Sequence, residues 1–362
     1  MALPLSELLL PLPAACSARD LLCRTGSGNS RRSRSSGEDC VGAMVDFVDG
    51  SPGSPEVAYH KEKSTFFQLA SKHVAHASMG AAAVLDGAPV QEDHDDAALF
   101  IIDPQVDFHE GGTLGIDGAT ADSERIAKLI EKHPDSIDHI FVSLDTHHRI
   151  HIAHAAFWRN AAGESPAPFT EILHADVRAR KWVPREKQLD KWALEYTASL
   201  EKGGRFKHVI WPYHCVLGTV GHAVTPVLMP ALDEWSTRRQ RAVTWVLKGQ
   251  NNRTEMYSAL KAEVPVKDDP ATHINRTLVA SLASHRQVLI CGEAKSHCVN
   301  QTTRDLLSLW PKDRSSDIVV LTDATSPVAG FEEKGAQFIK DMTAAGLTMC
   351  TTTDWVPPPK IN

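Results

Sequence analysis

Apolar runs that alternate with helical segments constrain the fold of this 362-residue chain more than any other feature. Unbroken apolar runs of this kind are typical of strands buried on both faces in a parallel sheet. The runs expected to be strands are residues 97–102, 139–144, 209–211, 242–247, 287–291, 318–321 and 347–351. The segments with helical spacing of apolar residues are 121–132, 224–235, 274–284, 299–309 and 332–345. We therefore expect right-handed crossovers and a parallel sheet covered by helices on both faces.

Reactive side chains recur directly after the expected strands. Asp103, Asp145, His214, Lys248 and Cys298 each follow the carboxyl end of one of these runs. In open parallel α/β sheets, ligands bind at the edge where the strands end. We therefore expect these five side chains to converge on one site.

Cys298 has the setting of a nucleophile, since a strand, a tight turn and then a helix surround it. A thiol at a helix N-terminus, and one beside a cation such as Lys248, is biased toward the reactive thiolate. Asp103 could take the thiol proton and later deliver it to a leaving amine. Backbone N–H groups of the turn could hold an oxyanion. The alternatives are a buried structural cysteine, a helix-capping aspartate and a surface lysine.

A carboxylate and several imidazoles suggest a metal site. Asp145 and His147 lie two residues apart, on one face of an extended strand end, and His214 follows the run 209–211. One aspartate with two or three histidines is a suitable ligand set for Zn²⁺, Mn²⁺ or Fe²⁺. Only some of the nearby histidines can be ligands, and the rest would be surface or hydrogen-bonded side chains; these are His148, His151 and His154.

Charge, cysteine content and hydropathy exclude several classes of protein. The net charge of −7 provides no basic surface for nucleic acid. The seven cysteines are scattered, which indicates free thiols in a reducing compartment and favours a cytoplasmic location. No apolar run approaches the ~18 residues of a membrane span.

The chain divides by composition before the first expected strand. Residues 1–40 are rich in Ser and Arg, and are expected to be a disordered tail or an organellar transit peptide. Residues 41–95 would form an N-terminal extension with a helix near 64–79. The main domain is expected over residues 96–355.

Five motifs together resemble, in order, those of the nicotinamidase/isochorismatase-like cysteine hydrolase superfamily. They are Asp103-Pro-Gln-Val-Asp-Phe108, Asp145-Thr-His147, Trp211-Pro-Tyr-His-Cys215, Lys248-Gly249 and Gly292-Glu-Ala-Lys-Ser-His-Cys298, and the similarity spans roughly residues 95–355. The resemblance implies an α/β fold of doubly wound, three-layer type, with a six-stranded parallel sheet and helices on both faces.

The resemblance also assigns roles to individual residues. It implies a catalytic triad of Asp103, Lys248 and Cys298, and a divalent metal held by Asp145, His147 and His214. It implies a non-proline cis peptide before Ala294, with the oxyanion held by the N–H groups of Ala294 and Cys298. Phe108 and Trp211 match positions that pack on an aromatic substrate ring.

The chain departs from the family pattern in three places. Glu293 stands where the family usually has an apolar residue, which affects the expected shape of the pocket. A further metal histidine could be His151 or His154, and the family's His-x-x-Phe pattern favours His154. Residues 158–207 form an insertion, for which we expect a role as a lid, a substrate wall or a subunit contact.

The expected function is that of a metal-dependent cysteine amidohydrolase of nicotinamidase type, which converts nicotinamide and water to nicotinate and ammonia through a Cys298 thioester. One alternative is a hydrolase of another small amide or carbamoyl compound, and an alternative of another class is a catalytically retired binding or assembly module. The expected partners are a small-molecule amide and further copies of the chain, with no nucleic acid and no membrane.

Overall fold

The computed structural model describes residues 94–359 of the chain. The segment expected as a leader or tail, residues 1–40, lies outside this range. The extension expected over residues 41–95 also lies outside it, except for its last two residues, and so does the helix expected at 64–79.

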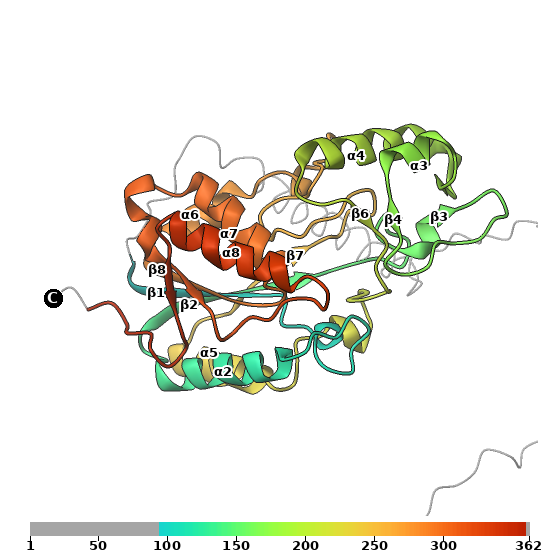
Figure 1. The fold of residues 1–362 in the computed structure, drawn as a ribbon. Coiled ribbons are helices and arrows are strands. Elements are labelled where there is room, and N and C mark those ends of the chain that lie inside the picture. Colours follow the sequence, from blue (N-terminus) through green and yellow to red (C-terminus); the bar gives the residue numbers. More distant parts are fainter. Residues whose placement is uncertain (1–93, 360–362) are drawn as a thin grey trace, which may run out of the picture. The chain divides into compact units, whose positions relative to one another are not determined.

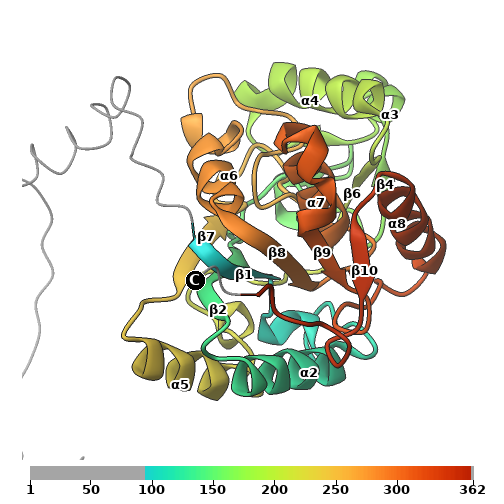
Figure 2. The same cartoon turned by 90° about the vertical axis from the view of Figure 1, so that its left-hand side faces the viewer.

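A six-stranded parallel sheet organises the described residues, with the strand order β10-β9-β8-β1-β2-β7 (Figure 2). Its strands are β1 (His94–Ile102), β2 (Ile137–Asp145), β7 (Thr244–Lys248), β8 (His285–Gly292), β9 (Ile318–Leu321) and β10 (Thr348–Cys350). The expected six-stranded parallel sheet is therefore confirmed.

Helices cover both faces of this sheet (Figure 1). On one face lie α2 (Ala119–Lys132) and α5 (Met229–Arg239), and on the other lie α6 (Arg276–Ala283), α7 (Cys298–Leu309) and α8 (Glu332–Ala344). Alternate residues of β1 serve the two layers: Phe100 belongs to the core beneath α6, α7 and α8, and Leu99 to the core beneath α2 and α5. This period of two confirms the doubly wound, three-layer fold.

The insertion and the residues that flank it share a small core, to which Trp158 and Tyr196 of the insertion and Ile210 beyond it contribute. Its helices are α3 (His174–Arg178) and α4 (Asp190–Gly203). Its strands form two antiparallel pairs, β3 (Trp158–Arg159) with β5 (Val183–Pro184), and β4 (Glu171–Ile172) with β6 (His208–Val209). Short 3₁₀ helices, η1–η6, occupy Val106–Phe108, Ala155–Phe157, Lys187–Leu189, Val220–His222, Pro270–Thr272 and Lys312–Asp317.

The prediction that residues 209–211 form a strand of the parallel sheet is wrong. Val209 ends the antiparallel strand β6, and His214 lies in the loop beyond it. The apolar character of this run has a different cause, since Ile210 is buried in the core of the insertion. Pro212 follows directly, and a proline has no N–H to donate to a sheet.

Helix α5 begins at Met229, five residues after the Val224 expected from its apolar spacing. Pro230 stands in the first turn, where the missing N–H has no intrahelical acceptor in any case. None of the described helices combines the length and apolarity needed to cross a lipid bilayer.

Candidate active site and metal centre

The sheet register sets three polar side chains at one edge. Asp145 pairs with Lys248 across β2 and β7, and Ile102 pairs with Gly292 across β1 and β8. Asp103 directly follows Ile102, and the turn after Gly292 leads to Cys298 at the start of α7. The carboxyl ends of four neighbouring strands therefore deliver the groups that the sequence singled out.

Lys248 lies between the acid and the thiol. Its Nζ is 2.9 Å from Asp103 Oδ2 and 3.6 Å from Cys298 Sγ. It also lies 3.0 Å from Asp145 Oδ1 and donates to the Met256 carbonyl at 3.0 Å. All of these side chains except that of Met256 are at most 6% exposed, so the ammonium is held by protein groups rather than by water.

The Asp103 carboxylate is fixed by its neighbour on β2. Ser143 Oγ donates to Asp103 Oδ1 at 2.7 Å, and the Asp103 N–H donates back to Ser143 Oγ at 3.1 Å. Asp103 has a φ of 44°, a left-handed conformation that side chains other than glycine rarely adopt. This conformation turns the chain out of β1 at the point where the carboxylate faces Lys248.

Burial controls protonation at this site. It raises the pKa of Cys298 well above the ordinary value, although the Lys248 charge acts in the opposite direction. Burial likewise raises the pKa of Asp103 despite Lys248. For Lys248, burial lowers the pKa, but the charges of Asp103 and Asp145 more than offset it and the pKa is raised. The sequence favoured a resting thiolate, whereas the structure favours a protonated thiol that has Asp103 as a hydrogen-bond partner.

The turn between β8 and α7 brings backbone N–H groups to the thiol. Gly292 has a φ of 99°, and a Cβ there would lie 2.1 Å from the Ile102 carbonyl oxygen, so only glycine fits. The Glu293–Ala294 peptide bond is cis, as the resemblance implied. Cys298 is the first residue of α7, where backbone N–H groups have no intrahelical acceptor.

Glu293 points away from the thiol. Its carboxylate accepts from the Ser326 N–H at 3.2 Å, and Ser326 Oγ donates to Asp122 of α2 at 2.6 Å. Burial, followed by the nearby charge of Asp122, raises the pKa of Glu293 well above its ordinary value. Glu293, which departs from the family pattern, therefore changes the contacts that hold this turn on the α2 side of the sheet.

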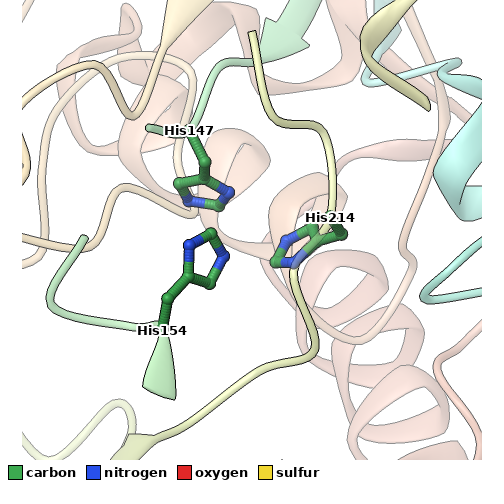
Figure 3. A group of neighbouring side chains, drawn as sticks. All are labelled: His147, His154 and His214. Atoms are coloured by element: carbon green, nitrogen blue, oxygen red, sulfur yellow. The ribbon is translucent and has the colours of Figure 1, made fainter. Parts of the chain in front are cut away.

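Three histidines bring their ring nitrogens within 4.8 Å of one another. They are His147, His154 and His214, all buried and drawn in Figure 3. The Asp145 carboxylate borders the group, with Oδ2 at 3.4 Å from His214 Nε2 and Oδ1 at 3.7 Å from His147 Nε2. The structure therefore gathers the four residues expected as metal ligands.

The hydrogen bonds of these rings fit a metal site. His214 Nδ1 is held by the Pro212 carbonyl at 2.8 Å, and His154 Nδ1 by the His148 carbonyl at 3.2 Å. His154 Nε2 is buried and has no hydrogen-bond partner within residues 94–359, and the same is true of His147 Nδ1. Metal-binding histidines usually have one nitrogen fixed by a carbonyl and the other free for the ion. Burial lowers the pKa of His154 to about 2, which keeps this ring neutral.

His151, the other candidate, has partners on both nitrogens. Its Nε2 lies 3.1 Å from the Thr254 carbonyl, and its Nδ1 accepts from the Ala153 N–H at 3.2 Å. It belongs to a second buried group with His147 and Glu255.

Glu255 is a residue of this site that sequence reasoning missed. Its Oε1 lies 3.4 Å from His147 Nε2 and accepts from the Met256 N–H at 2.9 Å. Burial would raise its pKa, but the His147 hydrogen bond and charge lower it. The only available signal was a single charge in the otherwise uncharged stretch 254–260.

The two aromatic residues expected to contact the substrate lie on different sides of the site. Phe108 packs against the His214 ring, with centroids 5.4 Å apart. Trp211 donates from Nε1 to the Tyr257 hydroxyl at 3.0 Å and lies 5.4 Å from the His297 ring. Trp211, Tyr257 and His297 line a cavity of about 490 Å³.

In comparisons with known proteins, no family model matches the chain. The nicotinamidase of Escherichia coli (strain K12) is 26% identical over 261 residues, which are 71% of this chain and 96% of that protein. The solved structure of an Acinetobacter baumanii nicotinamidase pyrazinamidase has a TM-score of 0.50 and 23% identity, over 73% of this chain and 99% of its own.

The similarity to the E. coli protein agrees with the resemblance that the motifs carry, and the likeness to the solved structure supports the fold. The E. coli protein to which the chain is similar, over nearly the full length of that protein, is a nicotinamidase.

Proposed function

We propose that this protein is a metal-dependent cysteine amidohydrolase of nicotinamidase type, which converts nicotinamide and water to nicotinate and ammonia. The observation that carries the proposal is the position of Lys248 Nζ, 2.9 Å from the Asp103 carboxylate and 3.6 Å from the Cys298 sulfur. This arrangement occurs in a chain that is similar to nearly the whole of a curated nicotinamidase.

The chemistry follows from these three side chains. As the Cys298 sulfur attacks the amide carbonyl carbon, Asp103 takes the thiol proton. The N–H groups of Ala294 and Cys298 would stabilise the oxyanion. Asp103 then protonates the amine, ammonia leaves and a thioester forms. A water molecule that gives its proton to Asp103 attacks the thioester, which releases nicotinate, and the proton returns to the sulfur.

Lys248 keeps the acid and the thiol in place during this sequence. Its charge stabilises the carboxylate form of Asp103 when the proton leaves, and it favours the developing thiolate. Because burial raises the pKa of both Asp103 and Cys298, one proton is retained by the pair and passes between them.

A divalent metal would be held by Asp145, His147, His154 and His214. When bound, it supplies a Lewis acid that orients the ring nitrogen of the substrate. Imidazole and carboxylate ligands suit Zn²⁺, Mn²⁺ and Fe²⁺ alike.

Ammonia release from a panel of small amides, with nicotinamide included, tests the proposal. Cys298→Ala should lower turnover at least about 10³-fold, because the nucleophile is lost. The matched control is Cys350→Ala, in a half-buried thiol on β10, which should keep wild-type turnover. Substantial turnover by Cys298→Ala would exclude the covalent mechanism, and release of ammonia only from amides other than nicotinamide would exclude the proposed substrate.

A further inference from the structure

The cavity beside the active-site turn has walls from three parts of the chain. Phe206 comes from the end of the insertion, His297 from the turn before α7, and Phe331 and Lys334 from the start of α8. At about 490 Å³, the cavity has room for a single aromatic ring with its substituents.

Its wall around His297 is aromatic, and its charged lining residues are Glu171, Glu201, Arg205, Lys207 and Lys334. The His297 ring stacks on Phe206 at 5.2 Å with 19° between the planes, and meets Phe331 edge-on at 4.7 Å. Burial lowers the pKa of His297 to about 3, so the imidazole is neutral. His297 directly precedes Cys298 in the chain, so this cavity shares a wall residue with the turn that leads to the thiol.

One cation of the cavity has no carboxylate partner. Lys334 Nζ lies 4.1 Å from the centre of the Phe206 ring and 5.5 Å from that of Phe331. Within residues 94–359, no ion pair joins this ammonium to an acid, and the carboxylate of Glu171 that acts on it is bound by Lys207 at 2.8 Å. Another cation of the rim, Arg205, is paired with Asp305 at 2.6 Å.

The half-buried ammonium of Lys334 thus stands over aromatic rings with no carboxylate of residues 94–359 in ion-pair contact, and the nearby Glu171 is engaged by Lys207. Partial burial of a charge is unfavourable unless an opposite charge or a hydrogen-bond acceptor joins it. A ligand carboxylate would supply both, while the ring of the same ligand would cover the aromatic wall. A neutral amide would gain the ring contact alone.

We propose that this cavity binds aromatic carboxylates, with the ring against His297 and Phe331 and the carboxylate on Lys334. The inference rests on the proposed function in one respect, since nicotinate, the expected product, belongs to this class of ligand. Lys334 then distinguishes the acid from the amide and holds the product on its way out. Product inhibition would be the functional consequence.

Isothermal titration of the full-length protein with nicotinate, benzoate and nicotinamide tests this inference. Benzoate has no ring nitrogen for a metal, so its affinity reports on the aromatic wall and on Lys334. In Lys334→Met, the Kd of both acids should rise about tenfold, because a charge-assisted contact is lost. The Kd of nicotinamide should stay within about twofold, and Lys334→Arg should restore most of the acid affinity. Lys340→Met, on the exposed side of the same helix, is the matched control and should change nothing.

Equal acid affinities in wild type and Lys334→Met would overturn the inference, and so would equal losses in Lys334→Met and Lys340→Met. Failure of this inference and failure of the proposed function can be told apart. If nicotinamide is not hydrolysed but benzoate binding depends on Lys334, the proposed function fails and the binding site stands. If nicotinamide is hydrolysed and the Kd of the acids is the same in wild type and Lys334→Met, only the inference fails.

Discussion

Lys248 joins the proposed catalytic and metal-binding groups, because its single ammonium contacts both Asp103 and Asp145. Nζ lies 2.9 Å from Asp103 and 3.0 Å from Asp145. Removal of this charge would take away the shared counter-charge of two buried carboxylates, which is a costly change in a core. A loss of activity in a Lys248 variant would therefore combine a catalytic and a structural effect, and Cys298→Ala separates the two more cleanly.

Glu293 predicts a pH dependence of stability. Burial and Asp122 raise its folded pKa above the ordinary value of 4.5. The charged groups that face it are Asp122, itself bound by Arg125, and Lys295. Because the folded state binds the proton more tightly, the stabilisation is fully present below pH about 4.5 and is lost as the pH rises through the folded pKa.

Glu293→Gln removes this titration and keeps the shape of the side chain. Urea unfolding of both proteins at a series of pH values should show the wild type losing stability relative to Glu293→Gln as the pH rises. The difference should grow by at most about 1.4 kcal/mol per pH unit. Parallel curves for the two proteins would show that Glu293 does not titrate in this way.

Residues next to strand ends or within a recurring motif could be found from the sequence, whereas an isolated loop residue could not. Asp103, Lys248 and Cys298 follow apolar runs, so the parallel sheet alone predicts that they converge. Glu255 reaches His147 from a loop after β7, and no periodicity reports the path of such a loop. Likewise, the raised pKa of Cys298 depends on how deeply the thiol is buried, which is a property of the packed structure.

At the scale of elements, strands buried on both faces were the most predictable. Residues 97–102 and 318–321 had no polar alternation and indeed lie in the sheet as β1 and β9. The run 209–211 has the same composition, but Ile210 joins the core of the insertion, whereas Val209 and Trp211 pack with the core beneath α6, α7 and α8. A run of three residues is too short for its apolar periodicity to show which core its side chains join.

The loop after β2 carries a prediction about the metal. His147 and His148 are adjacent, but His147 is buried among the clustered rings and His148 is exposed, with only its carbonyl engaged by His154. His147→Ala should therefore lose most bound metal, whereas His148→Ala should retain it, because the backbone carbonyl remains.

Elemental analysis of the two purified variants and the wild type decides this point. Retention of stoichiometric metal by His147→Ala, or loss by His148→Ala alone, would contradict the proposed ligand set. His151→Ala is an informative third variant, since its ring nitrogens already have backbone partners and its removal should leave the metal bound.

At the scale of the whole molecule, the proposed chemistry lies within residues 103–298, and the sheet and helices that support it end by Trp355. Trp355 itself is part of this unit, because its Nε1 donates to Gln287 at 3.1 Å and its ring packs on His133. We propose that the folded catalytic unit requires no part of residues 1–40, because prolines break the apolar run 8–15 and the Ser- and Arg-rich residues 24–40 offer few side chains to a core.

Deletion of residues 1–40 should therefore leave kcat/KM for the active amide within about twofold and Tm within about 2 °C. Trp355→Ala is the positive control at the other end of the domain. It should destabilise the protein by about 3–5 kcal/mol, because a buried ring is lost from the core beneath α2. Thermal unfolding and ammonia release, measured on both variants, give the comparison. If the deletion lowers Tm as much as Trp355→Ala does, residues 1–40 pack on the domain, and its boundary lies closer to the N-terminus than residue 96.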